Sequence, residues 1–142
     1  KLDHELFARY CEASALMPMM QYSLNIWDLG NPETRRICQE MSALHAKYGD
    51  YIIACAKEAS QTGAPMVRAM EYAYPHCGYG GITDQYLLGD RILVAPVLKK
   101  GQRRRKVCIP TGKWRLSDKI YSNETVTLPC PVDTLLYFER ID

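Results

Sequence analysis

The first half of the chain has the hydrophobic and polar periodicity of helices. Apolar residues recur at steps of four, three and four near its start: Leu6, Tyr10, Ala13 and Met17. This spacing puts them on one face of a helix that Pro18 ends, and an extended segment over residues 19–23 is expected to follow. A second helical pattern begins at Asn31-Pro32, a typical N-cap and first turn, and ends at Gly63. Gly49 interrupts this pattern, so we expect it to kink or split the helix.

After residue 65 the pattern changes to short apolar runs separated by glycine and proline. Met66–Tyr72 is a strand candidate, and Ile92–Val97 is an almost continuous apolar run that suits a strand buried on both faces. Between them, Thr83 and Asp84 are expected to cap a short helical turn over residues 85–88. Four more strands are predicted: Lys106–Ile109, Lys113–Leu116, Thr125–Leu128 and Leu135–Glu139. Their spacing predicts a small antiparallel β-sandwich.

These two patterns predict two structural units, α/β followed by all-β, with a boundary between Tyr74 and Gly81 that divides the chain into 1–76 and 77–142. The first unit has too few strands to form a sheet of its own. Its segments are typical of a helix–strand–helix portion of an α/β fold. We therefore expect the chain to be the C-terminal piece of a larger protein.

Composition and charge exclude several classes of protein. The 142 residues are 47% hydrophobic, with 18 basic and 16 acidic side chains, which indicates a packed protein rather than a disordered or collagen-like one. No apolar run approaches the ~20 residues that span a bilayer. Six basic residues cluster: Lys99, Lys100, Arg103, Arg104, Arg105 and Lys106. This cluster is read either as a localisation signal or polyanion patch, or, preferably, as a solvated hairpin loop, and nothing indicates a nucleic-acid partner.

The cysteines and one short motif concern the chemical environment of the chain. Six cysteines are spaced singly without a CxxC pair, so no metal site is predicted and disulfides are permitted but not required. Asn123-Glu124-Thr125 is an acceptor triplet for N-glycosylation. This triplet favours the secretory pathway, that is, the ER or Golgi lumen, the lysosome or the extracellular space.

Four segments in register resemble glycoside hydrolase family 31, which contains α-glucosidases and α-xylosidases. The run TDQYLLGDRILVAPVL over residues 83–98 is similar to the family's connection between barrel and sandwich. Residues 61–68 and 109–114 resemble its arginine-bearing strand and its LPxGxW strand pair, and residues 6–20 resemble its penultimate barrel helix. The resemblance implies the end of a (β/α)8 TIM barrel, followed by the β-sandwich. It also implies hydrolysis of α-glycosides with retention, without a cofactor.

The same resemblance limits which site residues this chain contains. Both catalytic aspartates of the family are expected before Lys1, so no catalytic residue is assigned here. Many family α-glucosidases carry Arg-x-His at a barrel strand end where this sequence has Gln21-Tyr22-Ser23. This difference indicates a divergent branch of the family.

Four residues near that strand end are candidates for contact with a sugar: Gln21, Ser23, Trp27 and Asp28. Trp27 is expected either to stack on a pyranose ring or to fill a core, while carboxylate and amide groups bind hydroxyls.

Other polar and aromatic residues favour structural roles. Asp84 and Asp90 could face one cleft, but capping and closing a turn is the preferred interpretation. Arg68 is expected in a structural ion pair, and Trp114 and Tyr137 inside the sandwich.

The function predicted for the parent protein is a glycosidase that acts on α-linked terminal sugars, with a carbohydrate substrate as its partner. A membrane anchor would lie only in the part before this chain. The alternative is a non-catalytic binding or scaffold protein that kept the glycosidase frame. A less favoured third hypothesis is a sandwich lectin, in which residues 77–142 fold and bind sugar alone.

Overall fold

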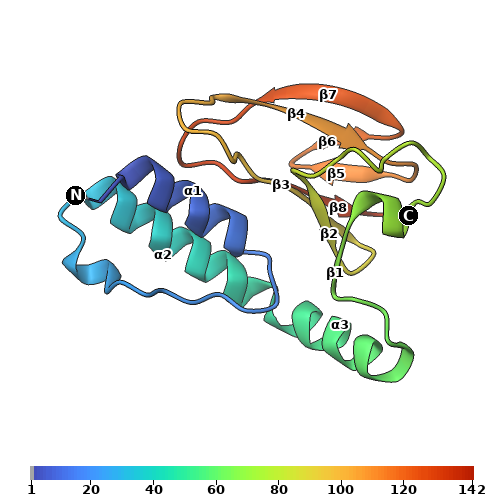
Figure 1. Ribbon diagram of the computed structural model, residues 1–142, viewed down its shortest axis with the longest axis horizontal. Helices are drawn as coiled ribbons and strands as arrows, with labels where there is room; N and C mark the ends of the chain where they lie inside the picture. The colour runs from blue at the N-terminus through green and yellow to red at the C-terminus, as the bar shows by residue number, and fades with distance from the viewer. Residues whose placement is uncertain (1) are drawn as a thin grey trace.

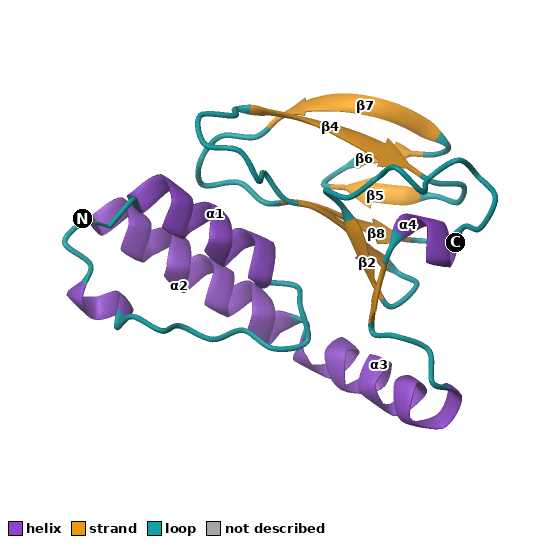
Figure 2. Ribbon diagram, in the orientation of Figure 1, coloured by secondary structure: helices purple, strands orange, loops and turns teal. Residues whose placement is uncertain are grey.

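Helices, a six-stranded sheet and a two-stranded ribbon form three successive layers (Figures 1 and 2). The computed structural model describes residues 2–142. Lys1, before which the family resemblance places the catalytic aspartates, lies outside the described residues. Among the described residues, no helix has the length and apolar character needed to cross a membrane.

The helical layer begins with two helices that run in the same direction. Helix α1 (His4–Ser14) starts at Asp3, whose side chain accepts a hydrogen bond from the Leu6 amide, and α2 (Pro32–Lys47) starts at the predicted Asn31 cap. His4 Nδ1 lies 3.3 Å from Thr34 Oγ1 near the start of both helices, and His45 Nδ1 lies 2.9 Å from the Ala15 carbonyl oxygen at their ends. These two contacts establish that α1 and α2 are parallel neighbours.

The predicted break in the second helical pattern is confirmed. Helix α3 (Gly49–Thr62) follows α2 after the single residue Tyr48, whose φ of −94° and ψ of 10° are not helical, and extends beyond the end of α2 (Figure 1). Gly63 ends α3 with a φ of 73°, a left-handed conformation that glycine adopts without steric cost.

The six-stranded sheet is antiparallel throughout and has the order β1-β2-β3-β8-β5-β6. Its strands are β1 (Val67–Arg68), β2 (Tyr86–Leu88), β3 (Ile92–Ala95), β5 (Trp114–Leu116), β6 (Lys119–Tyr121) and β8 (Leu136–Arg140). The ribbon pairs β4 (Arg104–Ile109) with β7 (Glu124–Pro129) and covers one face of the sheet. The expected antiparallel sandwich is therefore present.

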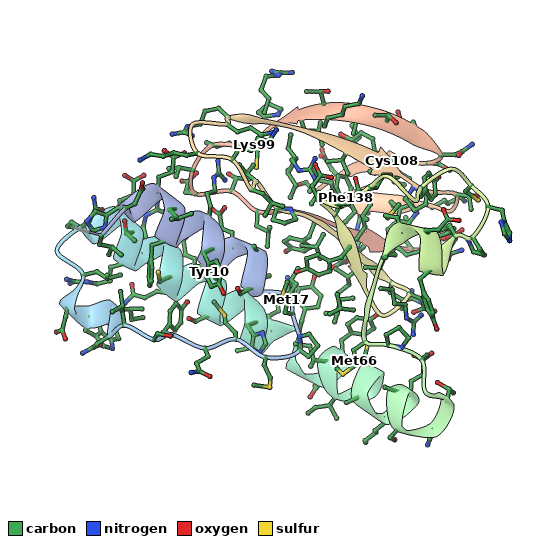
Figure 3. All side chains as sticks on the ribbon, viewed as in Figure 1. Tyr10, Met17, Met66, Lys99, Cys108 and Phe138 are labelled. Carbon is green, nitrogen blue, oxygen red and sulfur yellow. The ribbon has the colours of Figure 1, made fainter. Side chains whose placement is uncertain are left out.

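The central strand β3 separates two hydrophobic cores. Ile92 and Val94 pack with α1 and α2, whereas Leu93 and Ala95 pack with β4 and β7. All four residues are buried, as the continuous apolar run predicted. Phe138 lies in the second core between sheet and ribbon (Figure 3). Because successive side chains of a strand point to opposite faces, one sheet serves both cores.

Two predicted elements are wrong. The strand expected over Met66–Tyr72 is limited to β1, because the chain turns into the short helix α4 (Met70–Ala73), which buries Met70. The helical turn expected over residues 85–88 is β2. Leu87 and Leu88 are both fully buried, Leu88 in the first core and Leu87 in the second. Consecutive residues reach opposite cores because successive side chains of a strand point to opposite faces. Strand β6 was not predicted.

The aromatic residues of the sheet lie on different faces. Trp114 is buried between sheet and ribbon as expected, and its Nε1 donates to the Thr111 carbonyl oxygen at 3.1 Å. Tyr137 was also expected inside the sandwich, and this prediction is wrong. It alternates with Leu136 and Phe138 on β8, so it faces the helices and meets Tyr48 edge to face at 5.9 Å between ring centroids. The division into 1–76 and 77–142 stays a prediction, and the pairing of β1 with β2 crosses it.

Candidate functional site

All four candidate sugar-contacting residues lie in the segment that connects α1 to α2. Within this connection, residues 17–31 include the short helix η1 (Ile26–Asp28). Its apolar residues Met20, Tyr22 and Ile26 pack against the helical core. The candidates themselves are exposed: Gln21, Ser23, Trp27 and Asp28. The segment therefore has an anchored side and a solvent-facing side, although residues 19–23 form no strand among the described residues.

Tyr22 anchors the first half of this segment. Its hydroxyl donates to the Cys38 carbonyl oxygen at 2.9 Å and lies 3.0 Å from both Cys11 Sγ and Ser42 Oγ. Burial raises the pKa of the Tyr22 hydroxyl and raises that of the Cys11 thiol to about 12. Both groups are thus neutral at physiological pH. With Tyr22 directed into the helical core, its neighbours Gln21 and Ser23 are held outward.

Asn25 organises the second half of the segment. Its Oδ1 accepts from the Trp27 amide at 3.1 Å, and its Nδ2 donates to Asp28 Oδ2 at 2.9 Å. The other carboxylate oxygen of Asp28 makes no hydrogen bond within residues 2–142. The Trp27 side chain is 62% exposed, so it does not fill a core of the described residues. An exposed aromatic ring and a free carboxylate oxygen therefore come from consecutive residues of this segment, and groups of these two kinds bind a sugar ring and its hydroxyls.

The space beside Gln21 and Ser23 is small. A pocket of about 80 Å³ between α1 and this segment includes Phe7, Tyr10 and the two candidate residues in its lining. At about 30 Å³ per water, it has room for two or three water molecules. The described residues therefore form one wall of a candidate sugar site rather than an enclosed cavity.

The remaining candidate residues have structural partners. Asp84 Oδ1 lies 3.1 Å from Nη2 of the buried Arg105, which argues against a catalytic role with Asp90. Arg68 forms the expected ion pair, with Glu58 at 3.2 Å. No cluster of metal-ligating side chains exists within residues 2–142, and all six cysteines are free.

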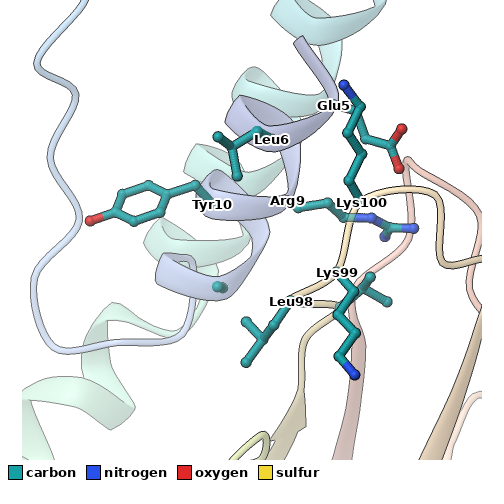
Figure 4. A pocket seen from close by; sticks show the side chains of 9 residues that line it. Glu5, Leu6, Arg9, Tyr10, Leu98, Lys99 and Lys100 are labelled. Atoms are coloured by element: carbon teal, nitrogen blue, oxygen red, sulfur yellow. The ribbon is translucent and has the colours of Figure 1, made fainter. Parts of the chain in front are cut away.

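The first half of the basic cluster, Lys99, Lys100 and Arg103, lies in a loop that contacts α1, whereas Arg104, Arg105 and Lys106 begin strand β4. Lys100 Nζ lies 2.5 Å from Asp3 Oδ2, and Arg103 Nη1 lies 2.6 Å from Glu5 Oε1. In Figure 4 Glu5 extends from α1 and Lys100 from the loop beside it. Arg103 and Lys100 form ion pairs with the acidic start of α1. The loop is therefore attached to a helix, unlike the solvated hairpin that the sequence favoured. Arg105 is buried in β4 rather than exposed.

Comparison with known proteins gives this arrangement a family. The model of the glycosyl hydrolase family 31 C-terminal domain matches residues 63–140. This match places the sheet and its ribbon among the glycoside hydrolases. The chain belongs to glycosyl hydrolase family 31.

Relatives extend the similarity to the helical part. The myogenesis-regulating glycosidase of Mus musculus is 34% identical over 96% of this chain, and the chain spans 20% of that protein. A probable alpha-glucosidase of Oryza sativa subsp. japonica is 29% identical over 92% of this chain and 16% of its own length. The similarity to the first of these proteins agrees with the divergent branch of the family that residues 21–23 indicate.

A solved family member has the same fold as this chain. The GH31 dextranase of Flavobacterium johnsoniae, complexed with glucose, matches 96% of this chain and 18% of its own chain. The TM-score is 0.88 at 26% identity. Helices and sheet are thus arranged relative to each other as in that enzyme.

Sequence reasoning selected four exposed residues of this segment but did not identify the residue that anchors it. Tyr22 was noted only as part of the altered strand end. The alternation of apolar Met20 and Tyr22 with polar Gln21 and Ser23 was the available signal.

Proposed function

We propose that this chain is the C-terminal part of a retaining glycoside hydrolase that acts on α-linked terminal sugars. Residues before Gly63 contribute the last helices of a (β/α)8 barrel, and the sheet and ribbon form the sandwich that supports it. The observation that carries this proposal is the match of the helical and sheet parts together to a family enzyme over 96% of the chain. The chain spans only a fifth of the mouse relative, so most of such a protein lies outside it.

An uncovered helix face supports the barrel assignment. Leu6 and Tyr10 are 61% and 71% exposed on α1 and line a pocket of about 140 Å³ with Leu98 of the loop after β3. Arg9 instead points toward the sheet loops (Figure 4). Two of the four residues of the apolar stripe read from the sequence, Leu6 and Tyr10, are therefore on an open side of α1. Apolar residues at this spacing normally pack against another element, and in the proposed parent that element belongs to the rest of the barrel.

The residues needed for the proposed chemistry are divided between this chain and the part of the parent protein before it. Retaining hydrolysis needs two carboxyl groups about 5–5.5 Å apart, one as nucleophile and one as acid and base. In a TIM barrel they come from the C-terminal ends of several strands, and we assign both to the part before this chain. The segment with Gln21, Ser23, Trp27 and Asp28 would bind the sugar beside them.

The test is turnover by the full-length protein. Purified protein is offered aryl α-glucoside, α-xyloside and α-galactoside, and the anomer first released is identified by NMR. Hydrolysis of one of them with an α-configured product supports the proposal, and the isolated 142-residue chain should release no product. Turnover by the isolated chain would contradict the assignment of both carboxylates to the preceding part.

A second candidate function is a non-catalytic carbohydrate-binding or scaffold protein. The replacement of Arg-x-His by Gln21-Tyr22-Ser23 favours it, because Tyr22 is directed into the helical core and leaves two short polar side chains toward the proposed sugar. Binding of a sugar by the full-length protein without turnover of any of the three glycosides would favour this function. In both cases we propose that the parent enters the secretory pathway.

A further inference from the structure

The acceptor triplet Asn123-Glu124-Thr125 lies at an exposed turn. Asn123 occupies the connection between β6 and β7, and residues 122–125 are all exposed. Its φ of 47° is in the left-handed region, which asparagine tolerates better than most residues. Its backbone amide donates to the Pro110 carbonyl oxygen at 3.0 Å, so the turn has a fixed backbone.

The side chain of Asn123 is available in a way that the other asparagines are not. Asn25 and Asn31 use their Oδ1 atoms to accept from the amides of Trp27 and Thr34. The Asn123 carboxamide makes no hydrogen bond within residues 2–142. Neither of the other two asparagines has serine or threonine two positions later, so Asn123 is the single acceptor in this sequence.

The turn is also remote from the surfaces that the proposed function uses. Strand β7 begins at the right of Figure 1, away from α1 and α2, and the segment of residues 17–31 runs along the opposite side of these helices. A bulky group on Asn123 therefore leaves the open face of α1 and the candidate sugar-contacting residues uncovered.

We propose that Asn123 carries an N-linked glycan in the parent protein. The donor is an oligosaccharide attached to a lipid pyrophosphate. Asn123 Nδ2 forms a bond to the anomeric carbon of the oligosaccharide, the bond from that carbon to the pyrophosphate oxygen breaks, and the amide loses one proton. The lipid pyrophosphate is the leaving group, and no oxidant or reductant is needed.

The glycan also has a physical consequence for the sheet. Strand β6 is an edge strand of the six-stranded sheet, and its Ile120 is 52% exposed. Edge strands with exposed apolar residues are sites of unwanted pairing between chains. A hydrated oligosaccharide at the adjoining turn hinders the approach of a second chain to this edge.

Mass spectrometry of the full-length protein from a eukaryotic cell tests the proposal. The tryptic peptide 120–140 contains the triplet. We expect it to carry an oligosaccharide mass that an N-glycan amidase removes, leaving aspartate at position 123. Thr125→Ser keeps the acceptor hydroxyl and should keep the glycan, while Thr125→Ala should lose it.

Thr125 is exposed, so both substitutions are compatible with the fold. An unmodified peptide 120–140 in the wild-type protein overturns the proposal, whether or not asparagines elsewhere in the parent carry glycans. A modification that persists in Thr125→Ala overturns it as well.

Discussion

Arg9 donates a hydrogen bond from Nη2 to the carbonyl oxygen of Cys130 at 2.8 Å, across 121 positions of sequence. The same guanidinium donates to the carbonyl oxygens of Gln102 and Thr134 at 3.1 and 3.2 Å. Glu12, whose Oε2 lies 2.9 Å from Arg9 Nη1, is fully buried beside it. One buried ion pair thus joins α1 to the two loops at one end of the β4–β7 ribbon, where Arg104 pairs with Pro129.

Removing this guanidinium should strongly destabilise the protein. Arg9→Met leaves Glu12 buried without its counter-ion and removes a charged donor from three carbonyl oxygens, which costs about 3–5 kcal/mol. The matched control is Arg36→Met on α2, where the ion pair with Glu40 is roughly half exposed and worth about 0–1 kcal/mol. Urea unfolding measures both. Equal effects of the two substitutions would show that Arg9 does not join the two parts.

Glu12 should make stability depend on pH in a defined direction. Burial raises the pKa of this carboxyl from 4.5 to about 7, although Arg9 acts to lower it. Between these two values the folded chain holds a proton that the unfolded chain releases, so the free energy of unfolding falls as pH rises through this window and levels off above it. Glu12→Gln should abolish that slope. Unfolding of wild-type and Glu12→Gln protein is measured from pH 4 to 8. The same dependence of the unfolding free energy on pH in both proteins would show that another group is responsible.

The helical half shows which features the sequence can predict. The Asn31 cap, the break at Gly49 and the helix end at Gly63 depend on local backbone chemistry, and each was predicted. The orientation of α1 could not be predicted in this way. By residue type, Leu6 and Tyr10 indicate a buried apolar face, whereas Arg9 and Glu12 indicate an exposed polar face. In the structure Arg9 and Glu12 are buried and Leu6 and Tyr10 are exposed, because the partners of Arg9 are carbonyl groups about a hundred positions away.

The candidate site shows the same limit. Residue type and position at a strand end were sufficient to select Gln21, Ser23, Trp27 and Asp28. The sequence did not indicate that the Tyr22 hydroxyl meets groups of two different helices, because that contact depends on the packing of α1 beside α2.

Tyr22→Phe tests this anchor. The substitution removes the hydroxyl that contacts Cys11, Ser42 and the Cys38 carbonyl oxygen, and we expect a loss of about 1–3 kcal/mol in stability. Tyr10→Phe is the matched control, because that side chain is 71% exposed and its hydroxyl makes no hydrogen bond within residues 2–142. Thermal unfolding compares them. A Tyr22→Phe protein as stable as Tyr10→Phe would contradict the anchoring role.

Gly89 should tolerate no side chain. It has a φ of 59°, and a Cβ there would overlap the Tyr51 hydroxyl and come within 2.8 Å of Cys55 Sγ. Gly89→Ala would therefore displace the Tyr51 hydroxyl that donates to the Leu88 carbonyl oxygen at 2.9 Å and holds α3 against the β2–β3 turn. Gly63→Ala shares the left-handed backbone but meets no atom within 4 Å. Urea unfolding should show Gly89→Ala to be less stable than Gly63→Ala by about 1–3 kcal/mol, and equal losses would exclude the clash.

Trp27→Ala should impair the proposed sugar site without affecting the fold. The indole is 62% exposed and lies outside both cores, so its removal leaves the packing intact. If the ring stacks on a pyranose, the lost interaction of about 0.5–1.5 kcal/mol lowers kcat/KM of the full-length protein by roughly 2- to 12-fold. Ile53→Ala on α3 is the control, because Ile53 is 54% exposed and remote in sequence from the segment of residues 17–31. Steady-state kinetics on the preferred aryl α-glycoside measure both variants, and unchanged kcat/KM in Trp27→Ala would remove this residue from the sugar site.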